Sequence, residues 1–166
     1  FAGGGDEELS VSVPLDQLLA EVASSHPADQ LQLELDNVEV MVKPVALSRA
    51  VANLIDNAFT YGQAPVVLRL LRSADQCSIE VWDQGEGMPQ RQWEQALQPF
   101  HRLDSSRGGE GHCGLGLAIV VHVARLHGGH LNCCYAEGLS DLKGPGRFAI
   151  RLSLPMELLV ENVAKS

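Results

Sequence analysis

Three short motifs that carry reactive or ligand-binding side chains follow one another in a fixed order. They are Asn53-Leu-Ile-Asp-Asn57, Asp83-Gln-Gly85-Glu-Gly87 and Gly114-Leu115-Gly116-Leu117. A carboxamide can ligate a metal ion, a carboxylate can accept a hydrogen bond from a base amine, and a Gly-rich helix start can hold phosphate. Each motif alone is weak, but the ordered set predicts a nucleotide pocket.

The first motif places polar side chains on one helical face. Asn53, Asn57 and Tyr61 are each four residues apart, so they line one side of a helix. Exposed helices often carry a single asparagine by chance, but two in one place lower helix propensity twice. The oxygen of Asn57 is a hard, neutral ligand suited to Mg²⁺ that phosphates already hold.

The second motif lies at the end of an apolar strand. Asp83 follows Ile-Glu-Val-Trp, and Gly85 and Gly87 come directly after it. An ordinary turn is one explanation of this pattern. The other is a base-binding site, in which Asp83 accepts a hydrogen bond from an exocyclic amine such as that of adenine, and the glycines let the backbone approach the flat base.

The third motif opens an apolar helix. Unpaired backbone amides at Gly114 and its neighbours would favour phosphate, whereas the alternative is a glycine turn packed closely against another helix. The polar stretch 98–111 precedes this helix and should be mobile. Its Arg102 or Arg107 could reach phosphate from a closing lid or simply face solvent, and we favour Arg102 for the contact.

The elements that must position these motifs follow from hydrophobic periodicity and turn residues. Pro44 opens a long helix, and Gly62 ends it. Asp36-Asn37 predicts a tight turn, so the strands on either side of it should form a hairpin. The predicted strands are 9–13, 31–35, 38–42, 66–71, 78–82, 130–135 and 148–154, and the predicted helices are 14–25, 44–61, 91–97 and 114–127, the last ending at Gly128-Gly129.

These elements predict an α+β fold, a two-layer sandwich with a mixed, mostly antiparallel sheet and helices packed on one face. A chain of 166 residues, 45% of them hydrophobic, is the size of one domain. We assign that domain to 9–155, after a flexible lead-in over 1–8 and before a tail over 156–166. The first residue is Phe1, which suggests a fragment of a longer protein.

Charge argues against binding to nucleic acid, and hydropathy argues against a membrane-spanning segment. With 12 Lys and Arg against 21 Asp and Glu, the net charge of −9 disfavours binding to nucleic acid. The longest relevant apolar run, 115–124, contains Gly116 and His122 and is too short to cross a bilayer.

The four cysteines predict free thiols and a cytosolic compartment. Cys133 and Cys134 are adjacent in a predicted strand and therefore point to opposite faces. Cys113 and these two cysteines do not form a recognised zinc spacing with the nearby histidines, so we predict no zinc site. Those histidines are His122, His127 and His130.

Four motifs together resemble those of the histidine-kinase ATP-binding domain. NLIDNAFTYG resembles its N box, DQGEGMP its first G box, QPFHRLD its F box and CGLGLAIV its second G box. The similarity runs from Pro44 to Pro155 and is strongest to the branch that contains EnvZ and RstB. It implies a Bergerat (GHKL) sandwich that binds ATP with Mg²⁺ and donates the γ-phosphoryl group to a histidine on a separate dimerisation domain.

The resemblance also implies roles for individual residues. Asn57 would hold Mg²⁺, Asn53 would assist at the phosphates, and Tyr61 would lie beside the base. Asn53, Asn57 and Arg102 would be the catalytic set. Asp83 would bind the adenine amino group with Gly85 and Gly87 shaping that wall, Phe100 would anchor the lid, Arg102 would meet phosphate, and His112, Gly114, Leu115, Gly116 and Leu117 would surround the phosphates.

The chain departs from the family pattern at two positions. His112 replaces a glycine, and Thr60 replaces the Lys or Arg that often precedes the tyrosine of the N box. None of the six histidines lies in a phosphoacceptor motif of the family's kind. The expected partners are therefore a histidine-bearing dimerisation domain of the same protein and a response regulator. The expected context is the cytoplasmic part of a bacterial inner-membrane sensor, homodimeric at full length and monomeric as this fragment.

Three other functions share the fold. ATPases of this type carry a glutamate as general base where this chain has Asn53, which cannot take a proton, so hydrolysis is disfavoured. A nucleotide-sensing module without phosphotransfer is the main alternative, because His112 and Thr60 affect the phosphate end. A serine kinase of the anti-sigma type fits poorly with the long lid and the F box.

Overall fold

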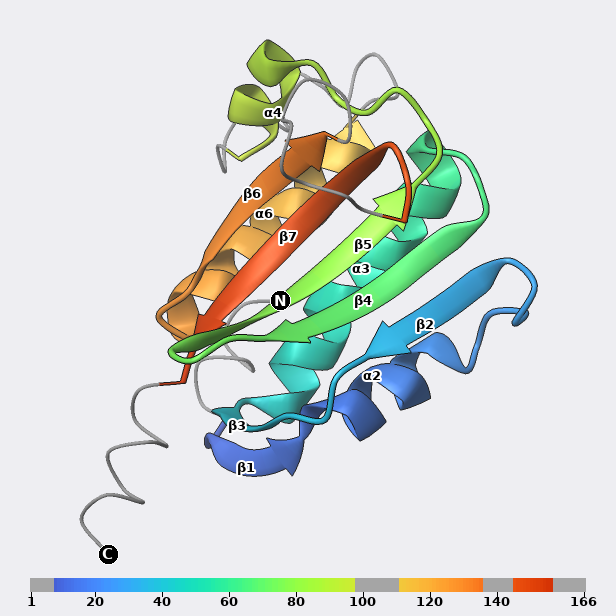
Figure 1. Ribbon diagram of the computed structural model, residues 1–166. Helices are drawn as coiled ribbons and strands as arrows, with labels where there is room; N and C mark the ends of the chain where they lie inside the picture. Colours follow the sequence, from blue (N-terminus) through green and yellow to red (C-terminus); the bar gives the residue numbers. More distant parts are fainter. Residues whose placement is uncertain (1–7, 98–110, 136–144, 157–166) are drawn as a thin grey trace, which may run out of the picture.

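The computed structural model describes residues 8–97, 111–135 and 145–156 (Figure 1). This part of the chain contains seven strands and four helices, as expected. In chain order they are β1 (Val11–Pro14), α2 (Leu15–Ala23), β2 (Leu31–Leu35), β3 (Glu39–Val42), α3 (Pro44–Tyr61), β4 (Val66–Arg72), β5 (Gln76–Asp83), α4 (Gln90–Ala96), α6 (Gly111–Leu126), β6 (His130–Tyr135) and β7 (Phe148–Pro155).

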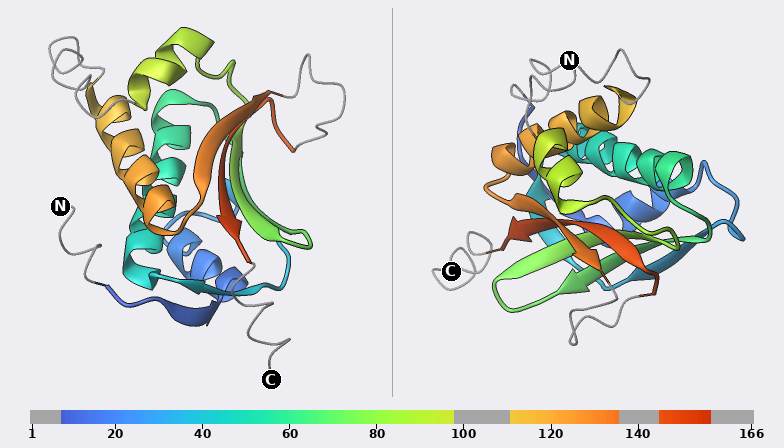
Figure 2. Two further views of the ribbon diagram at one scale, coloured as in Figure 1. Left: turned by 90° about the vertical axis from the view of Figure 1, so that its left-hand side faces the viewer. Right: turned by 90° about the horizontal axis from the view of Figure 1, so that it is seen from above.

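The main sheet has five strands in the order β2-β4-β5-β7-β6. β2 runs parallel to β4, and the other neighbours are antiparallel. The helices α2, α3 and α6 cover one face of this sheet, as both views in Figure 2 show. The predicted two-layer α+β sandwich is therefore confirmed.

The core lies between the helices and the inner face of the sheet. α3 contributes side chains at helical spacing, including Leu47, Val51, Leu54 and Ile55, all buried. They pack in one hydrophobic cluster with the inward-facing residues of the sheet and with α6, including Leu68, Leu70, Ile79, Val81, Leu152, Leu117 and Val120.

The predicted hairpin between residues 31–35 and 38–42 is wrong. β2 instead pairs with β4, and β3 pairs antiparallel with β1 in a separate two-stranded sheet. Asp36 explains the difference, because its backbone N–H donates to Leu70 O at 3.0 Å and its carboxylate accepts from Arg72 N at 3.0 Å. The residue predicted to turn the chain therefore extends the contact between β2 and β4.

The bounds of α3 agree with the prediction. Pro44 occupies the first turn, and the carboxylate of Glu8 accepts hydrogen bonds from Val45 N at 2.7 Å and Ala46 N at 2.9 Å. Glu8 thus satisfies two amides that the helix itself leaves unpaired. The helix ends at Tyr61, and the cap residue is Gly62.

α6 begins earlier than expected. It starts at Gly111, so Gly114 lies in its first turns and Gly116 lies inside the helix. Its end agrees with the prediction, since the helix stops at Leu126 and Gly128 has φ of 70°, the left-handed conformation of a helix terminator. Most other bounds differ from the prediction by one or two residues at an end.

A row of polar residues crosses the outer face of the sheet, opposite the helices. The register aligns one residue from each strand in the row Glu34, Arg69, Glu80, Arg151 and Asn132. Glu80 is buried and accepts hydrogen bonds from Arg151 Nε at 2.8 Å and Trp82 Nε1 at 2.8 Å. We call these five residues the charge row.

A second, apolar row lies beside the charge row. Val67, Trp82, Ala149 and Cys134 pair across four strands and are buried. Cys134 therefore faces away from Cys133, which packs against the main core, as predicted. The three cysteines whose side chains the structure describes are free thiols.

Within the described ranges, none of the helices combines the length and the apolar character that crossing a bilayer requires.

Candidate nucleotide-binding site

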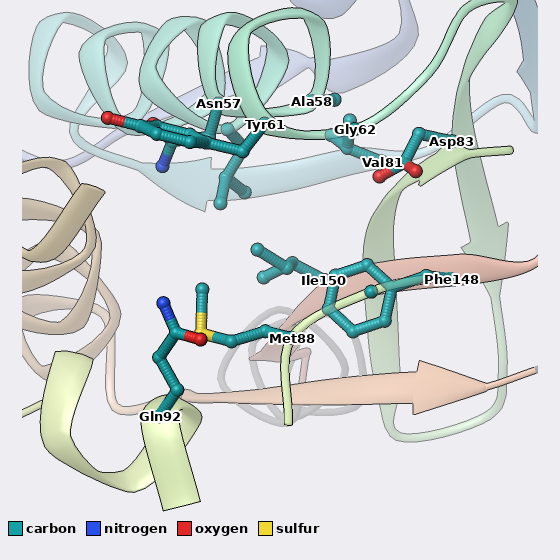
Figure 3. A pocket seen from close by; sticks show the side chains of 12 residues that line it. Asn57, Ala58, Tyr61, Gly62, Val81, Asp83, Met88, Gln92, Phe148 and Ile150 are labelled. Atoms are coloured by element: carbon teal, nitrogen blue, oxygen red, sulfur yellow. The ribbon is translucent and has the colours of Figure 1, made fainter. Parts of the chain in front are cut away.

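A cavity of about 270 Å³ opens between the C-terminal part of α3, the end of β5, the loop that follows it, α4 and the start of β7 (Figure 3). Two of the three sequence motifs contribute to its wall. The lining residues are Leu54, Asn57, Ala58, Tyr61, Gly62, Val81, Asp83, Gly87, Met88, Gln92, Phe148 and Ile150.

Asp83 supplies the carboxylate of the cavity. It is the last residue of β5 and is only 5% exposed. Gly85 N–H donates to its Oδ1 at 2.7 Å. Burial raises the pKa of Asp83 above its ordinary value, and the backbone N–H groups of Gly85 and Gln63 partly offset this effect by stabilising the ionised form. The carboxylate is thus a fixed acceptor in a poorly solvated wall.

Two glycines leave room for that carboxylate. A β-carbon on Gly62 would overlap the Asp83 carboxyl group, and a β-carbon on Gly85 would lie 3.0 Å from its Oδ1. The sequence predicted Gly62 only as the end of α3. Because it lacks a side chain, Gly62 also lets the end of α3 and the end of β5 approach each other.

Gly87 shapes the loop after Asp83. Its φ of 85° is one that other residues rarely adopt, and a β-carbon there would overlap the ring of Phe148. Gly87 therefore lies against Phe148 of β7, and Met88, the next residue, contributes to the lower wall of the cavity in Figure 3.

Asn57 presents an amide with an unsatisfied group. Its Nδ2 is buried and has no hydrogen-bond partner among the described residues. A β-carbon on Gly116 of α6 would lie 3.4 Å from this Nδ2 and 3.6 Å from Oδ1. A buried amide without a partner costs free energy, so this group is suited to a ligand that enters the cavity. The oxygen and nitrogen of an asparagine amide can exchange places, which lets it offer either an acceptor or a donor.

The other residues predicted from the first motif lie differently. Tyr61 is 47% exposed at the edge of the cavity. Asn53 is half-buried on α3 and is not among the residues that line the cavity. The structure therefore brings Asn57 and Tyr61 together with Asp83, and leaves Asn53 one turn away.

The third motif lies on α6. Gly116 faces Asn57, whereas the side chain of Leu117 is fully buried in the core. His112, Gly114 and Leu115 belong to the first turns of α6, where the side chains are not described. Phe100 and Arg102, predicted for the lid, lie outside the described residues.

Several lining residues were not predicted as site residues. Met88 and Phe148 are two apolar groups among them, and Gln92 reaches the cavity from α4. Met88 directly follows the second motif, so its position next to Gly87 was the one available signal. Phe148 and Ile150 come from β7, and only the pairing of Asp83 with Phe148 and of Val81 with Ile150 brings them here.

Comparison with known protein families gives a match over residues 42–158 to the family described as histidine kinase-, DNA gyrase B- and HSP90-like ATPases. The chain belongs to this ATPase family. The predicted GHKL fold is therefore confirmed.

The relatives of this ATPase domain are sensor kinases. Over 138 residues, 80% of the chain, it is 41% identical to the circadian input-output histidine kinase CikA of Synechococcus elongatus. Over 92 residues, 55% of the chain, it is 40% identical to the sensor protein RstB of Escherichia coli. The matched segments make up only 17% of CikA and 21% of RstB.

A solved structure supports the same grouping. The histidine kinase domain of the Escherichia coli osmosensor EnvZ matches the ATPase domain with a TM-score of 0.66 and 30% identity. The match covers 90% of this chain and 91% of that one. The predicted resemblance to the branch containing EnvZ and RstB is confirmed.

Proposed function

We propose that this chain is the catalytic domain of a sensor histidine kinase, which binds ATP with Mg²⁺ and donates the γ-phosphoryl group to a histidine on a separate dimerisation domain. The observation that carries the proposal is the pairing, in one cavity, of the Asp83 carboxylate with the unpaired Asn57 amide opposite Gly116. The carboxylate suits the adenine amino group, and the amide beside α6 suits the phosphate end.

Asn57 fits the magnesium that such a site requires. Its carboxamide is neutral and carries an oxygen of the kind that Mg²⁺ takes as ligand, while its buried Nδ2 has no partner among the described residues and could donate to a phosphate. Mg²⁺ bound there would neutralise charge on the phosphates. Gly116, by lacking a side chain, keeps the space between α6 and the Asn57 amide open.

The residues favour transfer to histidine over hydrolysis. Asn53 stands one helical turn before Asn57, and its amide cannot take a proton from water. A neutral imidazole needs no such base. Its nitrogen would form a bond to the γ-phosphorus while the bond from that phosphorus to the bridging oxygen breaks and ADP departs. The domain then has to position the phosphates, with Asn53, Asn57, Arg102 and the start of α6 as the groups we assign to that task.

We also propose the setting of this reaction. The histidine would belong to a dimerisation domain of the same protein, and a response regulator would receive the phosphoryl group. The whole protein would be a homodimeric sensor at a bacterial inner membrane, with this domain on the cytoplasmic side. The names of the relatives, a histidine kinase, a sensor protein and an osmosensor, support the sensory role in this proposal.

Two substitutions test the binding roles. Asn57→Ala should abolish Mg²⁺-dependent ATP binding and leave the unfolding curve nearly unchanged, because the buried Nδ2 has no hydrogen-bond partner to lose. Asp83→Asn should weaken ATP more than tripolyphosphate, which has no base. Isothermal titration measures both, and unchanged ATP affinity in Asn57→Ala would refute the assignment of that residue.

A transfer assay tests the reaction. The chain is mixed with γ-labelled ATP and a histidine-bearing dimerisation domain of the EnvZ type. Label on the dimerisation domain that is stable in alkali and lost in acid would support histidine phosphorylation. ATP binding without transfer to any such domain, including that of the full-length protein, would instead support the nucleotide-sensing alternative.

A further inference from the structure

Tyr135 connects the edge strand β6 to the loop that follows Asp83. Its hydroxyl donates a hydrogen bond to the carbonyl of Met88. Its ring lies against that of Phe148, with centroids 5.2 Å apart and planes tilted by 55°. Tyr135 itself does not line the nucleotide cavity, whereas Met88 and Phe148 both do.

The loop from residue 84 to residue 89 is held at its two ends, where Gln84 N–H donates to Gln63 O at 2.9 Å and Pro89 O accepts from Trp93 N at 2.9 Å, so the glycine-containing middle depends on further contacts. Gly85 and Gly87 have no side chains to pack, and glycine loses more conformational freedom than other residues when it is ordered. At its start, Gly85 N–H is held by the Asp83 carboxylate. Towards its end, the Met88 carbonyl is held by Tyr135. Gly87, between these two anchors, lies against Phe148, the ring that Tyr135 supports.

The hydroxyl of Tyr135 remains a donor at any physiological pH. Burial raises the pKa of Tyr135 to about 12, and the neighbouring Cys133 thiol contributes in the same direction. The Cys133 thiol donates weakly to this hydroxyl, with Sγ 3.9 Å from the oxygen, and so does not compete for its proton. The carbonyl of Met88 is therefore the acceptor for the Tyr135 proton.

We propose that Tyr135 is a positioning residue for nucleotide binding, which fixes the Met88 carbonyl and the Phe148 ring so that the base-side wall of the cavity is formed before ATP arrives. The inference rests on the proposed binding of the adenine base between Asp83 and this wall. Tyr135 does not touch the nucleotide. It acts by reducing the freedom that the loop would otherwise lose on binding.

The matched variant is Tyr135→Phe, which removes only the hydroxyl and keeps the ring against Phe148. We expect its affinity for ATP and for adenosine to fall by the same factor, about three- to tenfold, the usual effect of one lost hydrogen bond. Its affinity for tripolyphosphate with Mg²⁺ should be unchanged. Cys133→Ala, on the same face of β6, is the control and should leave all three affinities as they are.

A second measurement needs no nucleotide. In Tyr135→Phe, amide hydrogen exchange at residues 85–88 should be faster than in the wild type, while exchange in α3 and β4 stays the same. If the wild type bound no ATP, the proposed function would fail, but this measurement would still test the anchoring of the loop.

Three results would overturn the proposal. One is unchanged adenosine affinity and loop exchange in Tyr135→Phe. Another is an equal loss for tripolyphosphate, which would indicate a general structural effect. The third is the same loss in Cys133→Ala, which would assign the effect to the packing of β6.

Discussion

The carboxylate of Asp83 occupies the place where a β-carbon on Gly62 would stand. One residue ends β5 and the other follows α3, so the two elements that carry Asp83 and Asn57 meet where Gly62 lacks a side chain. The φ of Gly62 is −100°, a value that any residue adopts. Glycine is therefore required here for space and not for backbone conformation.

Gly62→Ala should displace the Asp83 carboxylate or push α3 away from β5. We expect at least a tenfold loss of ATP affinity and a loss of roughly 1–3 kcal/mol in the free energy of unfolding, as for other overpacked sites. Titration calorimetry and urea unfolding measure the two effects. Gln63→Ala is the control, because that side chain is exposed and the backbone N–H that reaches Asp83 is retained. Wild-type affinity in Gly62→Ala would show that the carboxylate can move without consequence.

Gly116→Ala should have opposite effects on stability and binding. The new methyl group would lie at 3.4 Å from Asn57 Nδ2, close but not overlapping, and alanine in a helix interior is favoured over glycine by roughly 0.5–1 kcal/mol. The variant should therefore be slightly more stable than the wild type. It should bind ATP and tripolyphosphate more weakly, because the methyl group fills the space beside the Asn57 amide, and it should bind adenosine normally. An equal loss for adenosine would argue against a phosphate end at this position.

The charge row predicts two very different costs for the loss of a glutamate. Glu80→Ala leaves Arg151 and the Trp82 N–H without their buried acceptor and should cost about 3 kcal/mol of stability. Glu34→Ala removes an end of the same row whose side chain is 53% exposed, 3.7 Å from Arg69, and should cost less than about 1 kcal/mol. Urea unfolding of both variants measures the difference, and similar small losses would mean that Glu80 is replaceable by water.

His127 should make the fold less stable in mild acid. Its Nε2 accepts a hydrogen bond from Lys43 N at 2.9 Å, and its Nδ1 lies 2.8 Å from the Val123 carbonyl, so the fold requires a neutral ring. Burial lowers the pKa of His127, the Lys43 charge acts in the same direction, and the Val123 carbonyl and Glu8 act against it.

The direction of this pH effect follows from the difference in proton binding between the folded and the unfolded chain. The unfolded chain takes up the proton near its ordinary pKa of about 6.5, whereas the folded chain resists until lower pH, so stability is constant above that value and falls as the pH decreases below it. His127→Gln retains an acceptor for Lys43 N and does not titrate. The stability difference between the wild type and this variant, measured by urea unfolding from pH 7.5 to pH 5, should therefore move against the wild type as acid is added. A difference independent of pH would contradict the prediction.

The sequence predicted well those features whose signal is local. The stripe on α3 and the strand before Asp83 each repeat with the period of their element, and Pro44 and Gly128 mark ends. The side chains of Asn57 and Asp83 consequently lie where the motifs indicated, in one cavity.

The errors have a common cause in contacts between distant segments. Asp36 and Asn37 are residue types that favour a tight turn. The backbone of β2 instead pairs with the parallel strand β4, and Asp36 N–H donates to Leu70 O of that strand. The task of Gly62 depends on β5, and that of Tyr135 depends on the loop that contains Met88. The residue pattern of a single helix or strand contains no information on such contacts with distant segments. The start of α6 at Gly111 is a smaller case, because glycines lower helix propensity without forbidding the helix.

The charge row also sets the alignment of the strand that ends in Asp83. Side chains of a strand alternate between its two faces, so a shift of β5 by one residue would bury Glu80 beneath α3 and turn Ile79 or Val81 towards water. The same shift would turn Asp83 out of the cavity. Opposite charges on the far side of the sheet thus favour one alignment of β5 during folding, and a chain that assembles with the wrong alignment loses both its core and the carboxylate in the cavity wall.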